Sequence, residues 1–316
     1  MQRFTRRGLL GRGLAGAVAL AAGCAAPRGL HPTAADARAP GAASAPGVFR
    51  ISLAQWSLHR SLRAGLLAPL DFPVVTARDF GLQGCEYVST FLDGMVGRPA
   101  RLAELDRRAR DHGVTSLLIM VDGAGQLGAA QTVERDEALA RHRPWLEAAA
   151  ALGCHSVRVN AAGPGPPEEL APRVADSLHR LALQAADFGL DVIVENHGGP
   201  SSNGAWLAAV LAAADHPRVG SLPDFGNFTL EDGRAYDRYR GVAELLPFAR
   251  AVSAKSHDFD AAGEETSTDY RRMLTLVRDS GYRGWIGIEY EGSRLSEAEG
   301  IVATRDLLER VRDELS

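Results

Sequence analysis

The sequence lacks the features that mark three common classes of protein. Its N-terminal apolar stretch covers only residues 14–22, whereas a membrane-spanning helix needs roughly 20 apolar residues. The formal net charge of −4 leaves no basic excess for binding nucleic acid. Only two cysteines, Cys85 and Cys154, follow residue 24. A disulfide framework is therefore not expected, and each cysteine follows a glycine at an expected strand start, where a small buried side chain fits.

Residues 1–24 are predicted to be an export signal. Residues 5–10 (TRRGLL) resemble a twin-arginine motif, and the apolar residues 14–22 have the length of a signal-peptide core. Small residues then lead to Cys24, as in a bacterial lipobox. The sequence thus predicts an exported protein, either periplasmic or anchored to the cell envelope by a lipid on Cys24. Cleavage near the alanine-rich stretch, without lipidation, is the alternative.

The next segment, residues 25–48, is predicted to be a flexible tether. It consists mainly of alanine, proline and glycine, so it buries too little apolar surface to offset the entropy of ordering. His31 lies in this segment and is not expected to take part in function. No charge run or low-complexity tract interrupts residues 49–316, which indicates a single domain.

Within residues 49–316, short β-branched runs alternate with longer amphipathic segments. Strands are expected at residues 51–55, 84–88, 116–121, 156–160, 191–195, 219–224, 252–257 and 285–289. Helices are expected near residues 69–80, 99–112, 133–152, 167–188, 203–214, 241–250, 268–280 and 295–314. Eight strand–helix pairs of about 33 residues each predict an α/β fold, a (β/α)8 TIM barrel. A doubly wound open sheet is the alternative.

Four acidic or imidazole residues end four successive expected strands. They are Glu195, Asp224, His257 and Glu289, at intervals of 29, 33 and 32 residues. A strand, a loop and a helix together need about 30 residues, so these side chains are expected at the same end of neighbouring parallel strands. Carboxylate and imidazole groups make an oxygen-rich site for one divalent ion such as Mn²⁺, Mg²⁺, Co²⁺ or Zn²⁺. An open sheet would give no reason for this recurrence.

The phrases around these residues carry a resemblance to a known family. VENHGG, LPDFGNF, AKSHDFD and GIEYEG resemble the xylose isomerase-like TIM barrels, in particular the sugar phosphate isomerase/epimerase group, and the resemblance extends from about residue 50 to the C-terminus. It implies that Glu195, Asp224, His257 and Glu289 bind one divalent metal. It also implies that Glu195 and Glu289 move protons on opposite faces of a sugar substrate. Related barrels often pair, so a homo-oligomer is left open.

The chemistry of such a site is consistent with that implication. A metal bound to a ketose carbonyl and its neighbouring hydroxyl acidifies the C–H between them. A carboxylate on each face can then remove a proton from one side and return a proton from the other. The chain departs from several ketose epimerases at Asn227, where they have a substrate-binding histidine. Because an amide hydrogen-bonds a hydroxyl but takes up no proton, the substrate itself does not carry over.

Three further residues are candidates for binding the substrate from the expected strand ends. His197 shares the face of Glu195 in an extended run and is expected to touch metal or substrate, or else to cap the next helix. Lys255 precedes His257 by two residues and so points inward, where it would polarise the substrate or pair with a buried carboxylate. Glu86 ends the second strand and either faces the pocket or belongs to a network inside the barrel.

The other candidates lie at the same rim. Asn160 ends the fourth strand with a free amide, and Glu291 shares the face of Glu289 in a supporting or loop position. Trp56 and His59 follow the first strand, where a sugar could stack on the indole. Trp56 is expected to be either core or pocket wall.

The sequence leaves more than one function open. The main hypothesis is a metal-dependent isomerase or epimerase of an unphosphorylated ketose or keto-sugar derivative, acting through an enediolate. A lyase or dehydratase on a keto-inositol or 3-keto-glycoside uses the same chemistry when a leaving group lies β to the carbonyl. A non-catalytic carbohydrate-binding lipoprotein is a third hypothesis. The related apurinic endonucleases need several more histidine ligands, and the acidic charge and predicted export also oppose that function.

Overall fold

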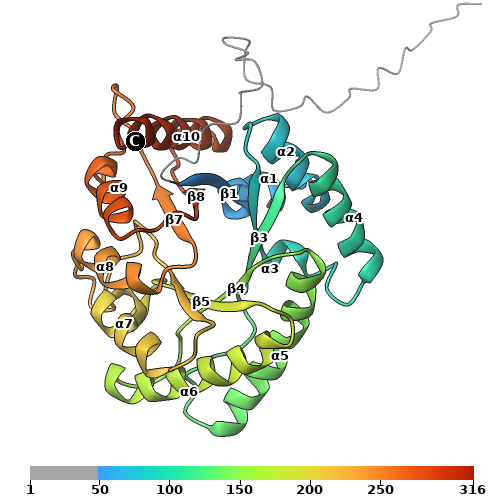
Figure 1. Ribbon diagram of the computed structural model, residues 1–316, viewed down its shortest axis with the longest axis vertical. Coiled ribbons are helices and arrows are strands. Elements are labelled where there is room, and N and C mark those ends of the chain that lie inside the picture. Colours follow the sequence, from blue (N-terminus) through green and yellow to red (C-terminus); the bar gives the residue numbers. More distant parts are fainter. Residues whose placement is uncertain (1–48) are drawn as a thin grey trace, which may run out of the picture. The chain divides into compact units, whose positions relative to one another are not determined.

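The computed structural model describes residues 49–316 (Figure 1). The predicted twin-arginine signal, the lipobox with Cys24 and the tether over residues 25–48 lie outside the described residues and stay predictions. No helix within residues 49–316 combines the length and apolarity needed to cross a membrane.

Eight parallel strands form one sheet. They are β1 (Arg50–Ala54), β2 (Gly84–Val88), β3 (Thr115–Met120), β4 (Ser156–Val159), β5 (Asp191–Glu195), β6 (Val219–Leu222), β7 (Val252–Ser256) and β8 (Trp285–Tyr290). Their order is β6-β5-β4-β3-β2-β1-β8-β7, so each strand lies beside its neighbour in the sequence and β1 pairs with β8.

The sheet closes between β6 and β7 through two isolated bridges. Ser221 pairs with Ala249, and Asp224 pairs with Ser253. The backbone N–H of Ser253 donates to the carbonyl of Pro223 over 2.9 Å. Pro223 has no N–H of its own to donate, which explains why regular pairing in β6 stops at Leu222. The closure confirms the predicted (β/α)8 barrel.

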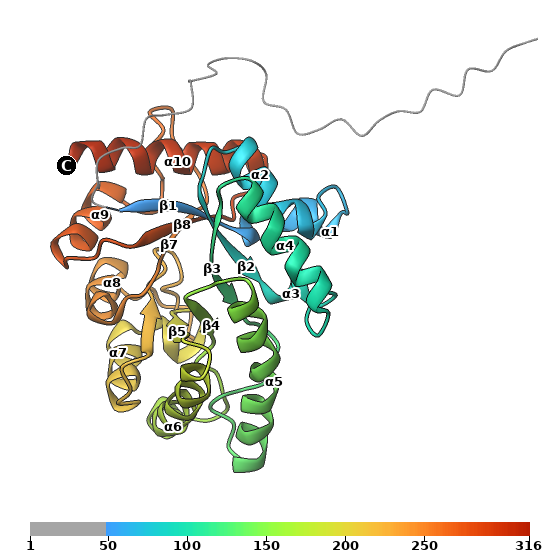
Figure 2. The ribbon, with the colours of Figure 1, turned by 45° about the vertical axis from the view of Figure 1, so that its right-hand side comes forward.

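Helices surround the strands on the outside, as Figures 1 and 2 show. The main ones are α2 (Phe72–Arg78), α4 (Pro99–Asp111), α5 (Thr132–Ala151), α6 (Pro167–Ala186), α7 (Gly204–Ala213), α8 (Arg238–Leu245), α9 (Tyr270–Asp279) and α10 (Glu297–Glu314). Each overlaps an expected helical segment. The short helices α1 (His59–Arg63) and α3 (Ser89–Leu92) follow β1 and β2 and were not expected. Both lie in loops at the carboxyl ends of strands, where TIM barrels place their active sites.

The apolar core has two parts because side chains alternate along each strand. The larger part lies between the strands and the outer helices and includes Val192, Val194 and the buried free thiols Cys85 and Cys154. A smaller cluster faces the barrel interior and includes Leu118, Met120, Ile193 and Leu222. Polar side chains at the carboxyl ends of β4 to β8 complete the interior above this cluster.

Candidate metal centre

Three carboxylates meet at the carboxyl ends of β5, β6 and β8. Glu195 is the last residue of β5, Asp224 follows β6 by two residues, and Glu289 is the penultimate residue of β8. One oxygen from each lies within 4.8 Å of the other two. All three side chains are buried, with exposed fractions of 1%, 0% and 5%. We call these three residues the triad.

Strand β7 contributes Ser253 and Lys255 to this cluster. Ser253 Oγ donates to Asp224 Oδ2 at 2.7 Å and lies 3.0 Å from Glu289 Oε2. Lys255 pairs with Glu289 in the strand register, and its Nζ lies 2.9 Å from Glu289 Oε1. His257 comes after the last residue of β7 and is exposed. The structure thus brings together three of the four predicted ligands, and His257 as the fourth stays a prediction.

Lys255 is the only lysine in the sequence, and it is 2% exposed. Its ammonium contacts Glu289 and also Glu291, the latter at 3.1 Å. Burial lowers the pKa of Lys255, but the surrounding carboxylates outweigh burial and hold that pKa well above its ordinary value. Its aliphatic stem passes Gly226 so closely that a Cβ there would lie 2.6 Å from Lys255 Cγ. A glycine at position 226 therefore makes room for this lysine.

Glu195 faces a guanidinium that sequence analysis missed. Arg158 projects from β4 and places Nε 2.9 Å from Glu195 Oε2. Its Nη1 lies 2.7 Å from Asp122 Oδ1, and Asn227 Nδ2 donates to Glu195 Oε1 at 3.0 Å. The available clue was a charged residue within the apolar run of β4, two positions before Asn160 and hence on the same inward face. Asp122, just after β3, gave no comparable clue.

The turn after β6 holds Asp224 in place beyond the strand end. The backbone N–H groups of Gly226 and Asn227 donate to Asp224 Oδ1 at 2.8 and 2.9 Å. The side chain of Asn196 accepts from the Asp224 N–H at 2.8 Å and donates to the Asp224 carbonyl at 3.1 Å. Because Asn196 directly follows Glu195, this amide ties the first two members of the triad to one another.

The three carboxylates differ in how easily they hold a proton. Burial, together with the nearby charges of Glu289 and Asp224, raises the pKa of Glu195 to about 8, and Arg158 opposes this only in part. Burial likewise raises the pKa of Asp224 to about 6. For Glu289, burial is outweighed by Lys255, Arg158 and Ser253, so its pKa is lowered. At neutral pH the site therefore favours an ionised Glu289 and a protonated Glu195 when no cation is bound.

The triad fits a divalent cation. In the described part of the chain, the three buried carboxylates are accompanied by two buried cationic side chains, Arg158 and Lys255. Within residues 49–316, the buried Glu195 Oε2 accepts no hydrogen bond, although it forms an ion pair with Arg158 Nε at 2.9 Å. A buried carboxylate oxygen without a hydrogen bond, beside two other carboxylates, is a position that a cation would stabilise. Oxygen donors of this kind suit Mg²⁺ or Mn²⁺.

Two more predicted residues join the network on the β4 side of the site. Asn160 Nδ2 donates to Asp122 Oδ1 at 2.8 Å. His197 is exposed, and its Nδ1 lies 3.1 Å from Asn160 Oδ1. The ring of His197 is thus exposed at the rim and outside the triad, while its backbone N–H donates to Ser201 Oγ.

The remaining predicted residues belong to the walls. Glu86 lies inside the barrel, where it accepts a 2.6 Å hydrogen bond from Ser52, and burial raises its pKa to about 7. Gly287 makes room for it, since a Cβ there would lie 2.4 Å from the carboxylate. Trp56 stacks on His59 with ring centroids 5.0 Å apart. It also packs against the interior apolar cluster and forms part of the wall.

Comparisons with known proteins agree with this architecture. A family model described as "Xylose isomerase-like TIM barrel" matches residues 74–311, and no curated protein matches the chain. A 3-keto-D-glucoside 4-epimerase from E. coli superimposes with a TM-score of 0.63 at 18% identity, covering 84% of this chain and 99% of its own. A xylose isomerase-like barrel from Mycobacterium smegmatis in complex with magnesium gives 0.64 at 18%, covering 85% and 98%. The IOLI protein with bound zinc gives 0.66 at 14%, covering 84% and 99%.

Proposed function

The chain belongs to the xylose isomerase-like TIM barrel family, and from this premise we propose that it is an isomerase or epimerase of a ketose or keto-sugar derivative. The proposal rests on one observation above all. Two buried glutamates, Glu195 at the end of β5 and Glu289 near the end of β8, meet in one carboxylate cluster at the carboxyl ends of the strands. Two carboxylates that reach one substrate carbon from different strands are suited to act as acid and base.

The placement of the two glutamates supports proton transfer on two sides of one carbon. They come from β5 and β8, three strands apart around the barrel, so their side chains approach the centre from different directions. Ionised Glu289 would remove the proton from the carbon next to the substrate carbonyl. Glu195 would deliver a proton to the other side of the resulting enediolate. An epimer forms when the two transfers occur on opposite faces, and an isomer forms when the proton returns to the former carbonyl carbon.

The cofactor in this proposal is one divalent ion, held by the three carboxylates of the triad. When bound, it would supply Lewis-acid polarisation of the carbonyl. Lys255 adds a positive charge beside Glu289, where it would help to hold a substrate oxygen that becomes negative. Asn227 donates to Glu195 and keeps its carboxyl group oriented. His197 and Asn160 at the rim would hydrogen-bond substrate hydroxyls.

The charges around the site favour a substrate without a phosphate. Asp122 and Glu291 add two carboxylates to the rim beyond the triad. Repulsion from these groups would weaken binding of a dianionic phosphoryl group. The E. coli neighbour is named for a keto-glucoside, and the predicted export points in the same direction. We therefore favour a neutral keto-sugar or keto-glycoside.

A lyase or dehydratase is the second candidate. Proton removal by Glu289 leads to elimination when a leaving group lies β to the carbonyl, and Glu195 would then protonate that group. The buried acid and base serve both reactions. Product analysis by NMR separates them, because an epimer keeps every atom of the substrate whereas elimination releases water or an alcohol.

The test is solvent deuterium incorporation into a panel of keto-sugars and 3-keto-glycosides, with the full chain loaded with Mg²⁺ or Mn²⁺. We expect deuterium at the carbon next to the carbonyl, with loss of incorporation in Glu289→Gln. Asp313→Asn, an exposed change on α10, is the matched control for removal of one carboxylate. No exchange into any panel member, despite stoichiometric metal, would contradict the proposal and favour a carbohydrate-binding protein.

A further inference from the structure

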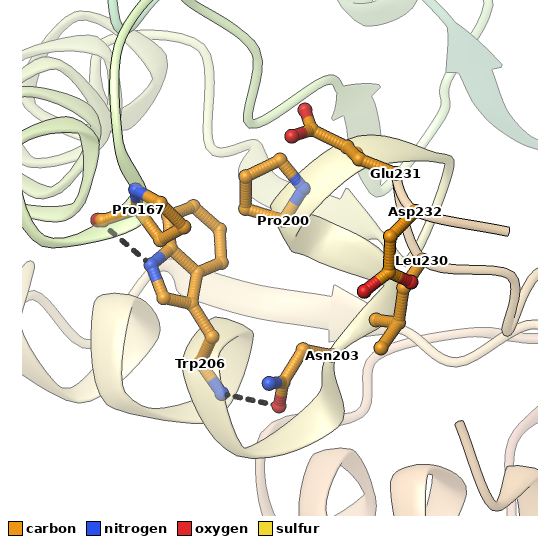
Figure 3. A pocket seen from close by; sticks show the side chains of 8 residues that line it. Pro167, Pro200, Asn203, Trp206, Leu230, Glu231 and Asp232 are labelled. Atoms are coloured by element: carbon orange, nitrogen blue, oxygen red, sulfur yellow. Dashed lines mark hydrogen bonds between the residues drawn. The ribbon is translucent and has the colours of Figure 1, made fainter. Parts of the chain in front are cut away.

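A second concavity lies on the same end of the barrel as the triad, outside the residues discussed so far. Its volume is about 280 Å³, close to the roughly 300 Å³ at which small-molecule pockets begin. The first residue of α6, the loop between β5 and α7 together with the first turn of α7, and the loop between β6 and α8 form it. Figure 3 shows Trp206 and Pro167 on one side and Leu230, Glu231 and Asp232 on the other. We call it the outer pocket.

The outer pocket has a flat apolar wall that is fixed in position. Trp206 Nε1 donates to the carbonyl of Pro167 at 2.9 Å, and Trp206 N donates to Asn203 Oδ1 at 3.1 Å (Figure 3). The indole N–H is therefore already bonded within the protein. The ring is left to offer its apolar surface, beside the ring of Pro200.

The opposite wall carries a carboxylate without a partner. Residues 228–236 form a small hairpin, in which the N–H of Tyr236 donates to the Phe228 carbonyl and the N–H of Leu230 to the Arg234 carbonyl, each at 2.8 Å. The tip presents Glu231 and Asp232 to the pocket. Asp232 pairs with Arg234 at 2.7 Å, whereas the carboxylate of Glu231 has no hydrogen bond or ion pair with any residue of the described domain.

An aromatic face opposite a free carboxylate suits a polyhydroxylated ring. The C–H face of a sugar packs on an indole, and a carboxylate accepts hydrogen bonds from hydroxyl groups. An anionic ligand is disfavoured because Glu231 would repel it. Two of the pocket's loops lead from the triad, since Gly199 follows Glu195 by four residues and Leu230 follows Asp224 by six.

We infer that the outer pocket binds a second, neutral sugar ring, so that the substrate is a glycoside whose keto-sugar unit lies at the triad. This inference rests on the proposed function for the reacting unit, but the outer pocket makes its own contacts and its binding is separable. A free monosaccharide would fill the triad and leave the outer pocket open. The pocket thus distinguishes keto-glycosides from free ketoses as the substrate class.

The test is calorimetric titration of the full chain with methyl β-D-glucoside, maltose and choline. We expect both sugars to bind, with affinity lowered about tenfold in Trp206→Ala and about fivefold in Glu231→Gln. Trp206→Phe keeps a flat ring and is expected to keep most of the affinity, which controls for folding. Asp313→Asn, on the distant helix α10, should bind as the parent does.

A triad variant separates this inference from the proposed function. Asp224→Asn should lose metal and activity while keeping sugar binding at the outer pocket. If the sugars bind equally well in Trp206→Ala, Glu231→Gln and the parent, or fail to bind the parent at all, the inference is overturned. Binding of choline alone, lost in Glu231→Gln, would overturn it in favour of an organic cation. Absence of exchange activity in the metal-loaded parent, with sugar binding at the outer pocket retained, would contradict only the proposed function.

Discussion

On the β5 side of the triad a guanidinium faces Glu195, and on the β8 side an ammonium faces Glu289. Arg158 lies 2.9 Å from Glu195 but is shared with Asp122 and Asn160. Lys255 donates a hydrogen bond to Glu289 Oε1, and Ser253 Oγ lies 3.0 Å from Glu289 Oε2. The pKa of Glu195 is nevertheless raised to about 8, and that of Glu289 is lowered.

The difference shows that proximity to a cation does not by itself keep a buried carboxylate ionised. Glu289 accepts a hydrogen bond from the charged Lys255 ammonium, which stabilises its ionised form. Glu195 receives one, from Asn227, and the carboxylate oxygen nearest to Arg158 Nε accepts none within residues 49–316. The same residue type can therefore serve as acid on one side of the site and base on the other.

The strongest test of this difference is to neutralise each glutamate separately. We expect Glu289→Gln to lower kcat/KM for keto-sugar exchange by about 10³-fold, within the range for losing a general base. Glu195→Gln removes the group that donates the second proton. We therefore expect it to lower kcat/KM for epimer formation more than it lowers kcat/KM for proton removal. Initial rates of deuterium incorporation and of epimer formation, measured side by side, give this comparison. Equal losses in both rates for both variants would contradict the division of roles.

Removing the ammonium is the next test. Lys255→Met leaves Glu289 buried without its cation, so we expect the free energy of unfolding to fall by about 3 kcal/mol. Added Mn²⁺ should restore more stability to this variant than to the parent, because the variant triad carries one more uncompensated negative charge. Urea unfolding with and without Mn²⁺ measures both effects. Lys255→Arg is the matched control for charge, and unchanged stability in Lys255→Met would show that the ion pair contributes little.

The pH dependence of stability tests the acid side of the comparison. A carboxyl group whose pKa is raised in the folded protein binds more protons when folded than when unfolded. Stability of the metal-free protein should therefore fall as pH rises from about 4.5 towards 8. We expect a decrease on the order of 4 kcal/mol from Glu195 across this window, with Asp224 adding to it up to its pKa of about 6 and Glu86 up to its pKa of about 7. Thermal unfolding in the presence of a chelator follows the trend, and Glu195→Gln should make it shallower, most clearly above pH 7 where Asp224 and Glu86 contribute little more.

The smallest effects concern strand β7, the strand from which the sequence predicted a fourth metal ligand. Ser253→His places an imidazole where Ser253 now contacts Asp224 and Glu289, and we expect zinc affinity to rise about tenfold. His257→Ala should change metal affinity little, since His257 is exposed and outside the triad. Competition with a coloured chelator measures both. A large loss in His257→Ala would instead support the ligand set predicted from the sequence.

The architecture was largely predictable from the sequence. The repeating pattern located all eight strands, and β2 and β5 match to the residue. Hydrophobic periodicity is sufficient for this because each strand buries one face on the helices and the other in the barrel. The short helices α1 and α3 were not predicted, because segments of 5 and 4 residues are too short to show a hydrophobic periodicity.

The composition of the site was less predictable, for a geometric reason. The four predicted ligands are evenly spaced along the sequence: Glu195, Asp224, His257 and Glu289. How deep each side chain lies in the barrel depends instead on the register between neighbouring strands. Lys255, not His257, pairs with Glu289. Arg158 was missed for a different reason. A single charged residue within an apolar strand indicates that it is buried beside an opposite charge, but the sequence does not identify that partner.

Because the chain contains a single lysine, the ammonium beside the triad can be observed in isolation. Growth on isotopically labelled lysine would give a protein with one labelled side chain, at Lys255. Its NMR resonance would report on the Glu289 and Glu291 contacts without interference from any other lysine. Titrating metal ions or sugars into that sample would show directly whether each one enters the triad or remains at its rim.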